Sequence, residues 1–81
     1  MKPVVNSEVI QSWTESREAK NHKGTLTTTG LTLWSYDLQI GDTIDGVKVV
    51  RDYSARGKWG YKSQTTSCHV GLARQWADLI D

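Results

Sequence analysis

The sequence predicts a small α+β domain made of an N-terminal helix, a three- to four-stranded antiparallel meander and a C-terminal helix packed on one face of the sheet. Both ends of the chain carry apolar residues at helical spacing, whereas the middle alternates and is rich in β-branched and aromatic residues. Within this middle part, Asp45-Gly46 is the signature of a tight hairpin turn. The chain is short enough, at 81 residues, to form one domain over residues 1–81.

The first predicted element is a helix that Asn6 or Ser7 can cap and that runs to about Ala19. A helix of this length is marginal in isolation, so it depends on docking against the rest of the domain. We expect it to dock through an apolar side formed by Val9, Ile10 and Trp13.

A loop follows, because Asn21-His22-Lys23-Gly24 combines polar residues with a glycine. We interpret His22 as a solvated loop residue. The threonine-rich residues 25–29 then predict a short edge strand, which Gly30 interrupts.

The clearest strand pattern covers residues 31–40. Gly41-Asp42 then bends the chain, and the hairpin at Asp45-Gly46 leads into a strand over residues 47–53. A final strand over residues 61–66 completes the predicted meander. Alternation in the first of these strands assigns its core face to Thr32, Trp34, Tyr36, Leu38 and Ile40.

The C-terminal helix is predicted to begin at Ser67, whose hydroxyl can accept a hydrogen bond from a free amide of the first turn. His69 then falls in that first turn, where the amide ends carry partial positive charge. The helix is predicted to face the sheet with Leu72, Ala73, Trp76, Leu79 and Ile80.

Composition limits the possible partners and the cellular compartment. Ten basic and nine acidic residues give a net charge of +1, too small to capture nucleic acid by net charge alone. A single cysteine excludes an internal disulfide framework and fits a reducing compartment. No signal peptide or membrane span is expected, so we predict a cytosolic protein. Four Trp and three Tyr without Phe indicate a thin, aromatic core, which a homodimer interface could complete.

The sequence predicts neither a metal site nor a catalytic one. The soft metal ligands are His22, Cys68 and His69, fewer than zinc needs, and the adjacent pair would point to different sides. Ser67, His69 and Asp52 could be drawn as a triad, but no nucleophile-elbow glycines surround the serine and its capping role explains it. We expect Cys68 to be a half-buried, inert thiol, and we expect no cofactor.

Two segments are candidate binding sites. The basic aromatic loop, residues 48–62, interleaves cations with aromatic rings, and proteins that bind single-stranded nucleic acid use these groups. The alternative without a binding function is a solvated hairpin. The candidate residues of this loop are Arg56, Lys58, Trp59 and Tyr61. At the predicted helix start, free amides and hydroxyls could hold an anion; the alternative there is a simple helix cap. The candidate residues of this junction are Thr65, Thr66, Ser67 and His69.

Leu33-Trp34-Ser35-Tyr36, followed by Ile40-Gly41 and later by Thr65-Thr66-Ser67-Cys68-His69, resembles elements of a broad group of short, uncharacterised bacteriophage and viral proteins. Members of that group combine a short helix, an Asn/Gly loop, a Leu-x-Ser-Tyr segment with Ile-Gly soon after it, and a Thr-Thr-Ser-x-His element. The resemblance implies a phage source and the host cytoplasm as setting. It assigns no activity and no catalytic residue, and the longer tail of this chain leaves a role in dimerisation open.

The expected function is that of a small non-enzymatic phage accessory protein that binds a host macromolecule, most simply a host protein, and inhibits a defence or metabolic factor. The alternative is a nucleic-acid or nucleotide binding protein that holds phosphate with the basic aromatic loop and the Thr65 to His69 junction.

Overall fold

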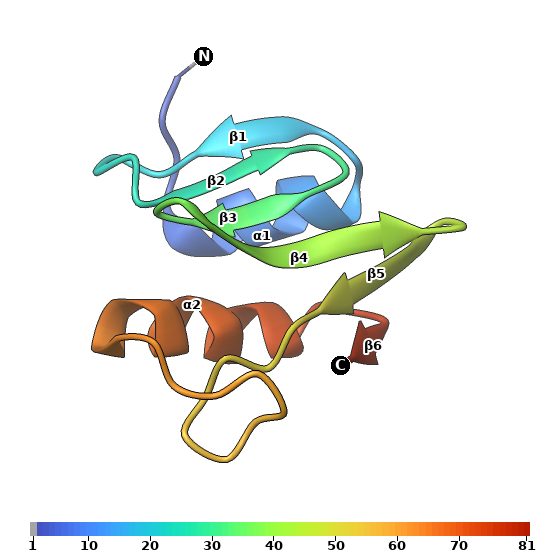
Figure 1. The fold of residues 1–81 in the computed structure, drawn as a ribbon. Helices are drawn as coiled ribbons and strands as arrows, with labels where there is room; N and C mark the ends of the chain where they lie inside the picture. The colour runs from blue at the N-terminus through green and yellow to red at the C-terminus, as the bar shows by residue number, and fades with distance from the viewer. Residues whose placement is uncertain (1) are drawn as a thin grey trace.

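A computed structural model describes residues 2–81 as two helices and a six-stranded sheet (Figure 1). The α+β class is confirmed, but the sheet has six strands instead of three or four and is mixed. Its strand order follows the chain from β1 to β6, with antiparallel neighbours except for the parallel pair β5 and β6. The elements are α1 (Asn6–Thr14), β1 (Glu18–Lys20), β2 (Leu26–Thr29), β3 (Leu33–Ser35), β4 (Leu38–Ile44), β5 (Val47–Val50), α2 (Gln64–Arg74) and β6 (Leu79–Ile80).

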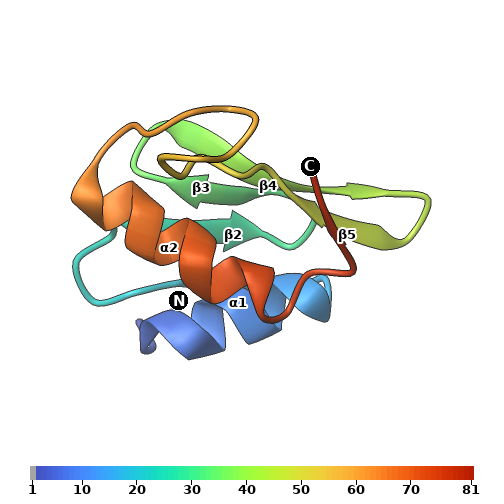
Figure 2. The same cartoon turned by 90° about the horizontal axis from the view of Figure 1, so that it is seen from below.

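Both helices cover the same face of the sheet, with α2 lying across it beside α1 (Figures 1 and 2). The expected apolar side of α1 is confirmed, because Val9, Ile10 and Trp13 are fully buried. Gly41 lets the strand approach the Trp13 indole, since a Cβ there would stand 2.8 Å from both the Trp13 ring and the Leu33 Cβ. This side of α1 belongs to one hydrophobic core, which also contains Ala19, Leu26, Leu33, Ile40, Val50, Tyr53, Val70 and Ala73.

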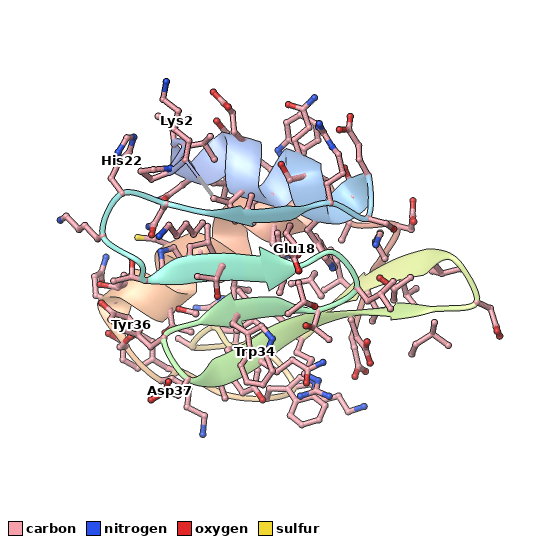
Figure 3. The ribbon with its side chains drawn as sticks, turned by 90° about the horizontal axis from the view of Figure 1, so that it is seen from above. Lys2, Glu18, His22, Trp34, Tyr36 and Asp37 are labelled. Atoms are coloured by element: carbon pink, nitrogen blue, oxygen red, sulfur yellow. The ribbon has the colours of Figure 1, made fainter. Side chains whose placement is uncertain are left out.

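The predicted single strand over residues 31–40 is wrong, because the chain reverses at Tyr36 and forms the β3–β4 hairpin. Tyr36 adopts a φ of 55°, a conformation that few tyrosines take and that the sequence pattern did not indicate. The predicted faces are inverted in β3, where Leu33 and Ser35 are fully buried, whereas Ile40 of β4 is buried as predicted. Trp34 lies instead with Glu18 on the face turned away from the helices (Figure 3).

The Asp45-Gly46 hairpin is confirmed. Ile44 pairs with Val47 across the turn, and both turn residues have positive φ, 52° and 79°. These dihedrals match the two-residue turn whose twist fits antiparallel strands. The predicted bend at Gly41-Asp42 is wrong, since β4 continues through both residues.

The first helix is shorter than predicted. It ends at Thr14, and the chain turns at Ser16 with a φ of 57° so that β1 can form before residue 21. β1 pairs with β2, and the predicted edge strand is therefore an inner strand. The N-cap is Val5, which offers no side-chain acceptor, and the prediction of Asn6 or Ser7 as the cap is wrong.

The second helix begins earlier and ends earlier than predicted. Residues 61–63 form no strand, and Ser63 caps α2 by accepting a hydrogen bond from the Thr66 amide at 3.1 Å. The predicted cap at Ser67 is therefore wrong. After Arg74 the chain leaves the helix to pair with the open edge of β5, so Trp76 is 43% exposed and the last apolar residues form β6.

Candidate functional site

The eight residues predicted to bind fall in two separate parts of the molecule. Arg56, Lys58, Trp59 and Tyr61 lie in the loop between β5 and α2, whereas the junction residues lie in the first two turns of α2. Thr65 and His69 border a pocket that none of the four loop residues lines. The structure therefore gives two candidate sites in place of one combined site.

The loop site is organised around Trp59. The guanidinium of Arg51 lies 5.0 Å from the centre of the indole, the ammonium of Lys58 lies 5.8 Å away, and the Tyr53 ring is 5.6 Å from it. The indole nitrogen of Trp59 donates to a carboxylate oxygen of Asp81 at 3.2 Å, and Lys58 donates to the other oxygen at 3.0 Å. We call these five residues the Trp59 cluster.

Backbone contacts hold the Trp59 cluster in place. The amide of Trp59 donates to the Asp52 carbonyl, and the amide of Asp52 donates to the Asp81 carbonyl at 2.9 Å. Residue 57 must be glycine, because a Cβ at that position would lie 2.0 Å from the carbonyl oxygen of Asp52. Trp59 is thus fixed although 39% of it is exposed.

The positive charge of the loop is partly neutralised by the Asp81 carboxylate. The hydrogen bond from Lys58 holds the pKa of the Asp81 carboxyl below its ordinary value, so this carboxylate is ionised near neutral pH. Arg56 and Tyr61 lie outside the Trp59 cluster and are exposed, Tyr61 by 54%. Together they give an aromatic and basic surface with one embedded acid.

A buried polar network connects α2 to the sheet. The Ser35 hydroxyl lies 2.7 Å from Nδ1 of His69 and 3.0 Å from the Thr66 hydroxyl, and all three residues are buried. His69 is in the second turn of α2 and not in the first, as the misplaced cap had implied. Burial lowers the pKa of the His69 imidazole below 6.5, so the ring is neutral at pH 7.

The Ser67, His69 and Asp52 triad considered from sequence does not assemble. The Ser67 hydroxyl donates to the Tyr53 carbonyl at 3.4 Å, while His69 pairs with Ser35. Ser35 has no exposed surface, so its hydroxyl is not presented to a substrate. The buried network therefore joins two elements, β3 and α2.

The pocket beside His69 has a volume of about 330 Å³ and lies where the start of α1 meets the turn between β1 and β2. Figure 3 shows Lys2 and His22 at this corner of the molecule. The pocket is lined by Val4, Val5, Asn6, Asn21, His22, Lys23, Thr25, Thr65 and His69, and no acidic residue is among them.

Asn21 shapes this pocket. Its amide nitrogen donates to the Asn6 side chain at 2.9 Å and to the Thr25 hydroxyl at 3.0 Å, and its oxygen accepts from the amides of Thr25 and Leu26. These bonds fasten the turn to the start of α1. In the sequence Asn21 is only part of a loop signal, because nothing in the local pattern shows what a loop asparagine will contact.

A second pocket, of about 470 Å³, lies at the start of α2. Of the residues predicted to hold an anion, Thr66 lines this pocket, whereas Thr65 and His69 line the first one. However, the Ser63 cap occupies the Thr66 amide, and the Asp37 side chain contributes to the lining. Asp37 and Lys62 bring opposite charges to this pocket, and the helix start is already capped, so the pocket is a weaker candidate for an anion than an uncapped helix start. Its remaining lining residues are Ser35, Tyr36 and Leu38.

Within residues 2–81, no three His, Cys, Asp or Glu side chains gather closely enough to hold a metal ion. Cys68 is exposed, in contrast to the half-buried thiol expected. Neither described helix has the length and hydropathy to cross a membrane. Comparison of the chain with protein-family models, curated proteins and solved structures finds no match.

Proposed function

We propose that this protein is a small non-enzymatic binding protein of the bacteriophage type that its motifs resemble, and that it engages a host protein through the Trp59 cluster and Tyr61. Acting in the host cytoplasm, it would inhibit the defence or metabolic factor that it binds. The observation that carries this proposal is an indole that is 39% exposed and yet held by hydrogen bonds and ring contacts. Such an anchor loses little conformational freedom when a partner covers it.

The composition of this surface supports a protein partner. Tryptophan, tyrosine and arginine supply most of the binding energy in protein interfaces, and here Trp59, Tyr61 and Arg56 lie in one loop. Lys58 and Arg51 add positive charge around the indole, so the partner is expected to present an acidic rim around an apolar pocket.

Nucleic acid is the second candidate for the same surface, because cations beside exposed rings also suit a single strand. The geometry favours it less. Two cations already lie over the Trp59 ring, so a base could stack on a covered face only after displacing one of them.

The test is affinity capture of partners from a lysate of the bacterial host, with and without nuclease and at two salt concentrations. A host protein retained through nuclease and higher salt, and then bound saturably by the purified protein, supports the proposal. Material lost on nuclease treatment, with affinity that falls steeply as salt rises, supports the nucleic-acid alternative.

A matched pair of tyrosine variants locates the surface. Tyr61 and Tyr36 are almost equally exposed, 54% and 53%, but only Tyr61 belongs to the loop. Tyr61→Asn is expected to weaken partner binding at least tenfold, while Tyr36→Asn leaves it unchanged, because asparagine tolerates the positive φ of that turn. Equal effects of the two substitutions would show that the partner binds elsewhere.

A further inference from the structure

A second surface, independent of the Trp59 cluster, carries a site of different chemistry. We infer that the pocket between the start of α1 and His69 binds a small organic phosphate. The phosphate would sit against the first amides of α1 and the His69 ring, and its organic part would lie against Val4 and Val5.

The first turn of α1 presents two amides that have no acceptor among the described residues. Val5 occupies the N-cap position without a side-chain cap, and within residues 2–81 the amides of Asn6 and Ser7 have no hydrogen-bond acceptor. The partial positive charge of a helix start favours an anion at such a place. In contrast, α2 has its own serine cap.

His69 is the independent second observation. The residue is only 3% exposed, and its Nδ1 is bonded to Ser35, but its Nε2 has no partner in the described chain. No fully buried side-chain nitrogen or oxygen in residues 2–81 lacks a hydrogen bond, so Nε2 keeps some accessible surface. His69 lines this pocket and not the second one.

The hydrogen-bond network around His69 favours one tautomer of its neutral ring. If Thr66 donates to Ser35 and Ser35 donates to Nδ1, each hydroxyl hydrogen has an acceptor. In the reverse direction the buried Thr66 hydroxyl has no acceptor among its described contacts. The first arrangement satisfies both hydroxyls within the chain, and in it Nε2 carries an N–H that can donate into the pocket.

The remaining lining suits the same ligand. Lys23 brings a positive charge, the Thr25 and Thr65 hydroxyls lie on the wall, and no carboxylate borders the pocket. A volume of about 330 Å³ exceeds what a bare phosphate ion fills and reaches the lower end of small-molecule sites. The apolar Val4 and Val5 would contact the rest of a phosphate ester.

The experiment is an NMR titration of the full chain with inorganic phosphate and with phenyl phosphate, using potassium chloride at matched ionic strength as reference. Saturable shifts at the Asn6 and Ser7 amides and at the His69 ring, with phenyl phosphate binding the tighter, are expected. Shifts that chloride reproduces, or failure of phenyl phosphate to bind, would overturn the inference.

Substitutions at the cap separate this site from its alternatives. Val5→Asp supplies the missing side-chain cap and a negative charge, so it should fold at least as well while weakening phosphate binding at least tenfold. Val5→Ala keeps the amides free, so it is expected to retain binding of inorganic phosphate, which has no organic part to contact Val5. Lys62→Gln, at the second pocket, should change nothing. Retained binding in Val5→Asp, or lost binding in Lys62→Gln, would place the phosphate elsewhere.

Discussion

At the residue scale, Ser63 and Ser67 differ in what their hydroxyls do. Ser63 accepts from the Thr66 amide at 3.1 Å, whereas Ser67 makes a long bond of 3.4 Å to a carbonyl. Ser63→Ala is expected to lower the free energy of unfolding by about 1 kcal/mol, and Ser67→Ala by less than half of that. Urea denaturation of both variants measures the difference, and a larger loss in Ser67→Ala would contradict the assigned helix start.

His69 makes stability depend on pH. Because burial lowers the pKa of this imidazole, the unfolded chain takes up a proton near pH 6.5 while the folded chain does so only at lower pH. Stability is therefore full above pH 6.5 and falls as the pH drops below it. The Asp81 carboxyl affects stability only at still lower pH, since its pKa lies below the ordinary value of 3.8.

Urea midpoints measured between pH 7.5 and 5 check this dependence, with His69→Gln as the comparison. The variant is less stable at pH 7.5 but should lose less on acidification, because it lacks the imidazole. Parallel pH profiles for the two proteins would show that another group is responsible.

At the scale of elements, two glycines should respond in opposite directions to the same substitution. A Cβ at Gly41 of β4 would stand 2.8 Å from Trp13 and Leu33, whereas a Cβ at Gly71 of α2 meets nothing within 4 Å. Gly41→Ala is expected to cost about 1–3 kcal/mol through overpacking. Gly71→Ala should add about 0.5–1 kcal/mol, because alanine is the better helix former. Thermal unfolding of both variants shows whether each substitution lowers or raises stability.

The elements that the sequence predicted well are those encoded locally. Asp45-Gly46 supplies the dihedrals that its turn requires, and Val9, Ile10 and Trp13 mark the inner side of α1 without reference to other segments. The β3–β4 reversal was missed because its positive φ falls on Tyr36, which carries no turn signal. Residues 79–80 were assigned to a helix because only the folded sheet offers them the edge of β5.

The candidate sites also combine features that the local sequence indicates with contacts that only the folded chain makes. The basic and aromatic character of the loop could be predicted from composition, but its fastening to Asp81 joins residues 22 positions apart. Ser35 and His69 are 34 positions apart, and Asn21 meets Asn6 only after α1 and β1 have packed. Contacts of this kind depend on tertiary structure, so no local pattern indicates them.

At the scale of the whole molecule, the last residue stabilises a loop that precedes α2. Asp81→Ala removes the acceptor of both Lys58 and Trp59, so the loop is expected to open more often. Hydrogen exchange at the Trp59 amide should become several-fold faster, whereas the Val9 amide in α1 keeps its rate. Asp37→Ala, in the exposed β3–β4 turn, is the control. Unchanged exchange in Asp81→Ala would mean that backbone contacts alone hold the loop.

The order of strands in the sheet has a consequence for how the chain folds. From β1 to β5 each strand pairs with the one before it, so most of the sheet can form from short-range hairpins with little loop-closure entropy. The bonds from Ser35 to Thr66 and His69 close much longer loops and should form after the transition state. Ser35→Ala is then expected to accelerate unfolding and to leave the folding rate nearly unchanged, which stopped-flow kinetics in urea would reveal.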